Sequence, residues 1–370
     1  MKTSGPPPTI FLFRIGQLGD TVCALPSIKA IRDRYATSKL YLVTDKHEES
    51  GFVSSWDILG PTGYFAGVVS YAVGLTGGRR LIDLVNVITS IRVKRPAVLF
   101  YLAPFPRSRG QVLRDHIFFR WLCGIREVHG CDQEPQVEPY NLREVAQVEC
   151  LHEADRLLAV LRRAGLQVPE QGKATFDLPL DRGVQQRVDV IWSEVGLPKD
   201  AGVVAMCPCS KMPSKRWPVE RFLSVARSIL SSYPQSHIVI LGAKGERDVC
   251  DGISQQLGKR ATSLAGRLSV LEAAEVLNRS RIYLGNDTGL MHLAAATGTK
   301  CVVVFSARDR PGKWHPYGEG HVVLRYDVPC AGCMLQECIE QNMQCLKMIS
   351  KEDVLAACHS LLRSDCVKTS

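Results

Sequence analysis

Apolar runs and amphipathic stretches alternate along the first part of the chain. Residues 10–15 form an apolar run that predicts a buried strand, and a polar turn over 16–19 follows it. From Asp20 to about Tyr35 apolar side chains recur at helical spacing, and residues 40–43 predict the next strand. A strand, a helix and a strand in this order are typical of a parallel β-sheet, so the pattern favours an α/β fold.

The alternation resumes after residues 56–78, an irregular region that is rich in glycine and aromatic residues. The apolar spacing then predicts helix 81–93, strand 97–102, helix 110–122, a short strand at 126–129 and helix 149–164. Residues 131–147 are polar and contain prolines, which predicts a connection. Residues 169–179 read as a linker or a short strand, and we place the domain boundary near residues 170–185.

The second half of the chain repeats the strand–helix alternation. It predicts helix 183–195, strand 202–206, helix 218–231, strand 237–241, helix 246–257, strand 261–264, helix 269–278, strand 281–284, helix 288–297, strand 301–305 and a last helix at 351–363. We therefore predict two Rossmann-like domains, at 1–175 and 183–325, and a cysteine-rich segment with a C-terminal helix at 326–370. The length of 370 residues also exceeds one typical core. Two such domains side by side imply a cleft for a ligand.

The most informative turn is residues 285–292, which read Gly-Asn-Asp-Thr-Gly-Leu-Met-His between a predicted strand and a predicted helix. In an α/β sheet such a turn lies at the carboxyl edge, where ligands bind. Main-chain N–H groups at a helix start suit a phosphate. The alternative is a plain helix cap at Asp287 or Thr288 with Gly298 as terminator. Both interpretations are open on this segment alone.

Three further turns carry polar side chains at the carboxyl ends of predicted strands. They are residues 16–20, residues 208–218 and residues 242–246. The first lies in the N-terminal domain and the others in the C-terminal domain. Parallel sheets would bring each set to one edge.

Composition and charge restrict the class of protein. Hydrophobic residues make up 45% and charged residues 22%, which is ordinary for a globular protein. The net charge is +9, with +4 in residues 1–170 and +5 in 171–370, so no basic tail indicates nucleic acid. The charge fits phosphorylated or acidic ligands, or attraction to an anionic membrane surface. No stretch approaches the roughly 18–20 apolar residues of a membrane span, and the first apolar run is too short for a signal peptide. We expect a cytoplasmic protein.

Four motifs resemble glycosyltransferase family 9, the bacterial heptosyltransferases of lipopolysaccharide core synthesis. They are Arg-Ile-Gly-Gln-Leu-Gly-Asp at 14–20 with Ala-Leu-Pro at 24–26, Lys-Arg-Trp-Pro at 215–218, the Leu-Gly and Gly-Glu pairs at 241–242 and 245–246, and Gly-Asn-Asp-Thr-Gly at 285–289 with His292. Each is weak alone, but their order across two β/α domains is fairly specific. The resemblance implies the two-domain GT-B architecture, inverting transfer from ADP-heptose to a lipopolysaccharide inner-core acceptor, and no catalytic metal.

The resemblance also assigns site residues. Asp20 matches the catalytic base of the family, which takes a proton from the attacking hydroxyl; the alternative is a helix N-cap. The predicted donor site consists of Ser210, Lys211, Lys215, Glu246, Asp287, Thr288, Gly289 and His292. Lys215 would face the leaving diphosphate with Ser210 and Lys211. Glu246 would accept from the ribose or the base, and Asp287 from sugar hydroxyls, while the N–H groups of residues 288 and 289 face phosphate.

Arginines are the predicted acceptor contacts. Arg107, Arg109 and Arg114, with Arg120 nearby, flank or line a predicted helix and could hold phosphate or carboxylate groups of a lipid-linked or phosphorylated saccharide. A solvated basic face is the alternative. Such an acceptor would place the protein at the cytoplasmic face of the inner membrane as a peripheral contact.

The C-terminal segment is rich in cysteine. Cys330, Cys333, Cys338 and Cys345 follow one another with two, four and six residues between them. Four thiolates make a tetrahedral set, so a structural zinc or iron is one interpretation. A loop of reduced thiols is the other. The resemblance implies that the helix after it packs back on the first domain.

Two other functions remain as alternatives to heptosyl transfer. The same fold could use another nucleotide sugar, or a protein or capsule acceptor. It could also bind a nucleotide sugar without catalysis, although the intact Asp20 argues against this. A dinucleotide-dependent oxidoreductase is disfavoured, because no G-x-G-x-x-G follows the first strand.

Overall fold

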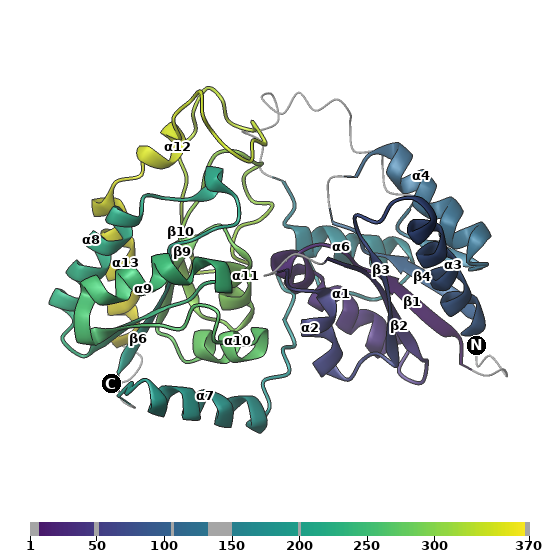
Figure 1. Cartoon of the computed structure of the whole chain (residues 1–370), viewed down its shortest axis with the longest axis horizontal. Helices are drawn as coiled ribbons and strands as arrows, with labels where there is room; N and C mark the ends of the chain where they lie inside the picture. The colour runs from purple at the N-terminus through teal and green to yellow at the C-terminus, as the bar shows by residue number, and fades with distance from the viewer. Residues whose placement is uncertain (1–6, 48–51, 105–106, 132–149, 199–200, 367–370) are drawn as a thin grey trace. The chain divides into compact units, whose positions relative to one another are not determined.

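The structure is a computed structural model that describes residues 7–47, 52–104, 107–131, 150–198 and 201–366, with the backbone alone for 364–366. The chain forms two compact units (Figure 1). Unit 1 comprises residues 1–140 and 153–177, and unit 2 comprises 141–152 and 178–370. The predicted connection at 131–147 lies outside the described residues except for its first residue.

Unit 1 is built on a five-stranded sheet in the order β3-β2-β1-β4-β5, with every neighbouring pair parallel. The strands are β1 (Thr9–Phe13), β2 (Leu40–Lys46), β3 (Gly67–Ala72), β4 (Pro96–Tyr101) and β5 (Glu127–His129). The strand order reverses between β1 and β4. In doubly wound sheets the ligand site lies at the carboxyl ends of the strands at this reversal.

Helices and short helical turns cover the sheet of unit 1. They are α1 (Leu18–Arg34), α2 (Ser55–Leu59), η1 (Gly60–Thr62), α3 (Gly77–Val93), α4 (Arg109–Ile117), the π-helical turn η2 (Phe118–Leu122) and α6 (Glu153–Arg163). Helix α1 packs against α2 and α6. Val87 and Ile91 of α3 and Phe119 of η2 join a core that includes Phe11 and Leu99 from the sheet.

Unit 2 is built on a six-stranded sheet in the order β11-β10-β9-β6-β7-β8, again with parallel neighbours. Its strands are β6 (Gly202–Cys207), β7 (Ser236–Ile240), β8 (Ala261–Ser263), β9 (Ile282–Asn286), β10 (Lys300–Val304) and β11 (Val322–Leu324). The order reverses between β6 and β9. The loops after these two strands are therefore the expected place for a ligand.

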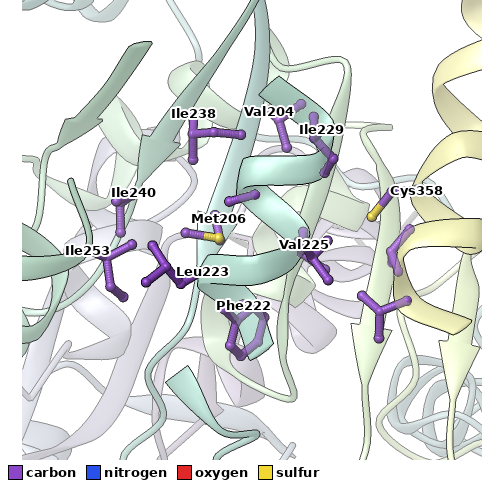
Figure 2. Close-up of a cluster of buried hydrophobic side chains, with 14 of the residues drawn as sticks. Val204, Met206, Phe222, Leu223, Val225, Ile229, Ile238, Ile240, Ile253 and Cys358 are labelled. Carbon is purple, nitrogen blue, oxygen red and sulfur yellow. The ribbon is translucent and has the colours of Figure 1, made fainter. Parts of the chain in front are cut away.

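The helical elements of unit 2 surround this sheet. They are α7 (Arg182–Glu194), η3 (Pro213–Lys215), α8 (Val219–Ser232), η4 (Lys244–Glu246), α9 (Arg247–Leu257), η5 (Gly258–Arg260), α10 (Val270–Asn278), α11 (Gly289–Ala296), α12 (Gln344–Lys347) and α13 (Lys351–Cys366). Helices α8 and α13 pack together on strands of the sheet. In Figure 2, Cys358 of α13 points toward Val225 and Ile229 of α8, and all three are buried in one core. Helix α13 therefore belongs to unit 2, and the expectation that it packs back on the first domain is wrong.

The α/β fold class with two parallel sheets is confirmed. The sequence pattern missed β3, which lies inside the region predicted as irregular. Only Val69 of its six residues is fully buried, so the strand carries no continuous apolar signal. The pattern also ended β9 too early, because Gly285 and the buried Asn286 still belong to the strand. Among the described residues, no helix combines the length and apolar composition needed to cross a membrane.

Candidate active site

Asp20 lies in the turn between β1 and α1, at the carboxyl edge of the unit 1 sheet. Helix α1 begins at Leu18, so Asp20 is its third residue, and Gln17 occupies the N-cap position. The Asp20 Oδ2 atom accepts a hydrogen bond of 2.8 Å from the Gln17 main-chain N–H. Its side chain stays 23% exposed. The carboxylate is therefore held in place by the helix start without being buried.

Arg14 stabilises this turn through hydrogen bonds to main-chain carbonyls. It is fully buried, its Nη1 atom donates to the Leu102 carbonyl at 2.5 Å, and it also donates to the Asp20 carbonyl. Its guanidinium lies 3.9 Å from carboxylate oxygens of both Asp20 and Glu153. Burial lowers the pKa of Arg14 from its ordinary value, and these two carboxylates oppose that fall. Arg14 thus places a positive charge 3.9 Å from the Asp20 carboxylate.

Glu153 pairs with a second arginine of this network, Arg156. It is fully buried and accepts two hydrogen bonds from Arg156, at 2.7 and 2.8 Å. Burial works against the charge on Arg156, but Glu153 outweighs it, so the pKa of Arg156 is raised. Arg156 also donates to the Ala103 carbonyl at 2.9 Å, which ties α6 to the chain after β4. The β1 and β4 ends are therefore fixed by paired charges.

Because Gly16 has no side chain, the Asp20 carboxylate can lie directly beside it. Its φ is +111°, and a Cβ atom at this position would come within 2.7 Å of Asp20 Oδ2. A side chain here would both strain the backbone and displace the carboxylate.

We expect Gly16→Ala to lower kcat/KM for transfer by about tenfold, because the methyl group moves the carboxylate. The strained φ should also cost about 1–2 kcal/mol of unfolding free energy. Gly63→Ala is the matched control, since Gly63 has a φ of +68° with nothing within 4 Å of the added Cβ. It should show a similar loss of stability and normal activity. Equal activity losses in the two variants would show that displacement of Asp20 is not the cause.

In unit 2, Asn286 fixes the loop after β6. It is fully buried at the end of β9. Its Oδ1 atom accepts from the Trp217 main-chain N–H at 3.1 Å, and its Nδ2 atom donates to the Pro208 carbonyl at 2.8 Å. These bonds close residues 208–217 against the β9 end, and losing such a buried partner costs on the order of 1–3 kcal/mol. Sequence reasoning treated Asn286 only as part of a motif and missed this role.

Lys215 and Asp287 form an ion pair across the two loops. The Lys215 Nζ atom lies 2.5 Å from Asp287 Oδ2, and the two side chains are only 14% and 7% exposed. Asp287 therefore positions the ammonium group and offsets its charge. An ammonium group has three N–H bonds, so Lys215 can serve Asp287 and still donate to a phosphate oxygen. This pairing makes an acidic residue compatible with the phosphate site that the sequence predicts.

The cysteine-rich segment holds the Lys215 turn from the other side. Ser214 donates through its hydroxyl to the Leu335 carbonyl at 2.7 Å and through its N–H to the Gln336 carbonyl at 3.1 Å. Arg308, which is buried, donates to the Leu335 and Met334 carbonyls at 2.9 and 2.8 Å. The position of Lys215 thus depends on residues more than a hundred positions later in the chain.

The helix start after β9 presents the main-chain N–H groups of its first turn and is followed by a buried histidine. Thr288 is the N-cap of α11, but its side chain makes no capping hydrogen bond; its hydroxyl lies 3.3 Å from the Tyr283 hydroxyl. Gly289 is the first residue of the helix. His292 is buried one turn on, with its ring edge-on to His152 and Trp314 at centroid distances of 6.3 and 5.9 Å.

Lys313 and Trp314 were missed by the sequence reasoning. Lys313 is 4% exposed, and its ammonium lies 5.1 Å from the centre of the Trp314 ring. Trp314 also donates to Asp309 at 3.2 Å. No recognisable motif surrounds these residues, and only the fold brings them beside His292. A buried lysine next to an aromatic ring is a candidate for contact with an anionic or sugar ligand.

The remaining predicted donor residues have structural contacts of their own. Ser210 is buried, and its carbonyl accepts from Arg216 at 2.6 Å. Lys211 is exposed on the same loop. Glu246 accepts from the Ala243 main-chain N–H at 2.8 Å, in the manner of a helix cap. For Glu246 the structure shows the structural role, and the predicted ligand role stays a prediction.

The predicted acceptor arginines of unit 1 divide into two kinds. Arg107 and Arg114 both form ion pairs with Asp115, the second at 2.7 Å, and Tyr101 donates to the same carboxylate at 2.7 Å. Arg109 is exposed at the first position of α4. Arg107, Arg114 and Asp115 line a hollow of about 900 Å³ between α3 and α4. These residues thus form a structural charge network and also line the hollow.

The four cysteines of the C-terminal segment are half-buried, and none of them forms a disulfide: Cys330, Cys333, Cys338 and Cys345. We call them the tail cysteines. Burial raises the pKa of the Cys345 thiol, and the nearby Cys330 and Cys338 add to the rise. Among the described residues, no three of these four sulfurs lie within 4.8 Å of one another. The donor chemistry fits a soft metal, but the sulfurs would have to move closer together to form a tetrahedral site.

A comparison with protein families identifies the family of this chain. The model described as glycosyltransferase family 9 (heptosyltransferase) matches residues 118–344. The lipooligosaccharide heptosyltransferase 2 of Campylobacter jejuni is 27% identical over 158 residues. The match covers 41% of this chain and 48% of that relative, so it spans about half of the relative's length.

Solved structures share the fold of the whole chain. A glycosyltransferase family 9 protein from Veillonella parvula superposes with a TM-score of 0.74 at 18% identity, covering 98% of this chain and 99% of its own. The Escherichia coli ADP-heptose lipopolysaccharide heptosyltransferase II gives 0.68 at 16% identity, covering 96% and 99%. At these identities the likeness is one of fold.

Proposed function

Because the chain belongs to glycosyltransferase family 9, the heptosyltransferases, we propose that it transfers a heptose from ADP-heptose to a saccharide of the lipopolysaccharide inner core. The donor and the acceptor class are those in the names of the similar proteins. The observation that carries the proposal is the position of the motifs. Asp20 in unit 1 and the Lys215–Asp287 pair in unit 2 both lie at the carboxyl ends of strands where the sheet order reverses.

The proposed reaction is a single displacement with inversion. Asp20 takes the proton of the acceptor hydroxyl as its oxygen attacks the anomeric carbon of the heptose. The bond from that carbon to the diphosphate oxygen breaks, and ADP leaves with the electron pair. The helix start and Arg14 both favour the ionised carboxylate, which makes it a weak base. Asp20 then acts chiefly through position, removing the proton late in bond formation.

The donor half of the proposal rests on unit 2. Lys215 stabilises the negative charge that develops on the leaving diphosphate, and Asp287 holds it there. The N–H groups at Thr288 and Gly289 supply further donors at the start of α11. Ser210, Lys211, Glu246 and His292 complete the proposed donor contacts. No step of this reaction requires a metal ion.

The acceptor half rests on the arginine-lined hollow of unit 1. Arg107, Arg109 and Arg114 would contact phosphate or carboxylate groups of a lipid-linked or phosphorylated saccharide.

The decisive experiment is mass spectrometry of the product formed from ADP-heptose and a defined inner-core acceptor. We expect one added heptose. A panel of other nucleotide sugars and a protein acceptor serves as the control, and transfer from one of these alone would overturn the assignment.

We also propose that the tail cysteines bind one structural zinc or iron ion. The ion would draw Cys330, Cys333, Cys338 and Cys345 together and stabilise the segment that holds Ser214. Purified protein should contain about one metal ion per chain by plasma mass spectrometry.

Cys333→Ser should lower this metal content and the melting temperature, and Cys131→Ser, another half-buried thiol, should change neither. Metal-free protein with an unchanged melting temperature would instead support a loop of reduced thiols.

A further inference from the structure

One face of unit 1 exposes an unusual amount of apolar surface. Seventeen large hydrophobic side chains are exposed among the described residues, and ten of them lie between positions 73 and 122. Those of α3 are 39–63% exposed, apart from its last residue at 75%, and Trp121 after α4 is 70% exposed. The ten are Val73, Leu81, Ile82, Leu84, Val85, Val93, Leu113, Ile117, Trp121 and Leu122. An apolar concentration of this kind marks an interaction surface.

The two helices contribute to one continuous surface. The hollow between them is lined by Leu84 from α3 and by Leu113, Ile117 and Leu122 from α4 and η2. These four side chains are themselves exposed by 39–61%. Helices α3 and α4 lie on the same side of the unit 1 sheet in Figure 1. We call this region, residues 73–126, the α3–α4 face.

Residues 73–126 also carry most of the net positive charge of the chain. Residues 73–126 contain ten arginine or lysine residues and two aspartates, a net +8 within a chain of net +9. Eight of the arginines are exposed: Arg79, Arg80, Arg92, Arg95, Arg109, Arg114, Arg120 and Arg126. The remainder of residues 1–170 therefore has a net charge of −4. The even division between the two halves of the chain concealed this concentration.

Both acidic groups of the face are engaged within the protein. Asp115 is buried and paired with Arg107 and Arg114. Asp83 accepts from the Ala72 main-chain N–H at 3.1 Å. The face therefore presents apolar side chains and arginines with little opposing negative charge.

We propose that the α3–α4 face docks on an anionic phospholipid bilayer. Exposed leucine, isoleucine and valine side chains would enter the boundary between headgroups and acyl chains, as in helices that lie in the membrane plane. Trp121 suits the same boundary, because its ring is apolar and its indole N–H can bind a headgroup. The arginines would contact lipid phosphates. A protein partner would need a matching acidic and apolar surface, whereas a bilayer supplies both properties at once.

The docking deepens the proposed function, since it would bring the enzyme to a lipid-linked acceptor, but it does not depend on transfer. Vesicles without any saccharide therefore test it separately. We expect the full chain to sediment with vesicles of phosphatidylcholine mixed with phosphatidylglycerol. Binding to phosphatidylcholine alone should be weaker by about tenfold or more. Added salt should weaken the binding without abolishing it, because part of the attraction is apolar.

The variant Leu81→Ser with Ile82→Ser should reduce vesicle binding by about tenfold or more. Both side chains are more than 60% exposed, so the fold should persist. The matched control is Val190→Ser with Ile339→Ser, which removes two exposed apolar side chains from unit 2. Equal binding by the two double variants would overturn the proposal. A second result would also overturn the proposal. If the unmodified protein does not bind vesicles and is a dimer that Leu81→Ser/Ile82→Ser converts to a monomer, the face is a contact between two copies of the chain.

Discussion

Replacing Asp20 with asparagine should abolish heptosyl transfer while donor binding persists. Asparagine has nearly the same size, and its amide oxygen can still accept the hydrogen bond from the Gln17 N–H. It cannot take a proton from the acceptor hydroxyl. We expect kcat to fall by about a thousandfold or more, within or beyond the usual range for loss of a general base. The dissociation constant for ADP-heptose, measured by calorimetry, should stay within about twofold of the wild-type value.

Asp33→Asn is the matched control for this variant. Asp33 lies on the same helix, where it forms an exposed ion pair with Lys29 at 2.7 Å. Its loss should alter stability by less than about 1 kcal/mol and leave kcat unchanged. Turnover by Asp20→Asn at a normal rate would exclude Asp20 as the base. A loss of ADP-heptose binding together with a lower melting temperature would instead indicate that Asp20 only supports the turn.

Most helices and strands could be predicted from the local sequence, because parallel sheets bury their strands on both faces. Strands such as β6 and β10 are continuous apolar runs, and the helices between them show regular spacing. Strand β3 was not predicted, because it lies at the edge of the sheet and only one of its residues is buried. The motif residues were found by resemblance. The structure places residues 14–20 at the reversal of strand order in unit 1 and residues 215–218 and 285–289 at the reversal in unit 2, whereas the motif at 241–246 follows the neighbouring strand β7.

The contacts among the site residues could not be predicted in the same way. Asn286 bonds to Trp217 and Pro208, which are 69 and 78 positions away. Ser214 bonds to Leu335 across 121 positions. Such pairs depend on which strands are neighbours, and periodicity along the chain contains no such information. The α3–α4 face was overlooked for a different reason, because charge was summed over halves of the chain rather than over single elements.

The Lys215–Asp287 pair offers the second test with a large expected effect. Lys215→Ala removes the cation that faces the leaving diphosphate, and we expect kcat to fall by about 10²–10³. Lys259→Ala, at an exposed position of η5, is the control and should leave kcat unchanged. Unchanged turnover by Lys215→Ala would exclude this lysine from the stabilisation of the leaving group.

Asp287→Asn should lower kcat as well, because the ammonium group loses the carboxylate that holds it at 2.5 Å. The sequence predicted a different role for Asp287, as an acceptor from sugar hydroxyls. The double variant separates the two roles, since residues that act as one unit are not additive. If Asp287 acts through Lys215, Lys215→Ala with Asp287→Asn should be no slower than Lys215→Ala alone. Losses in kcat that multiply would show that Asp287 contacts the heptose independently of the lysine.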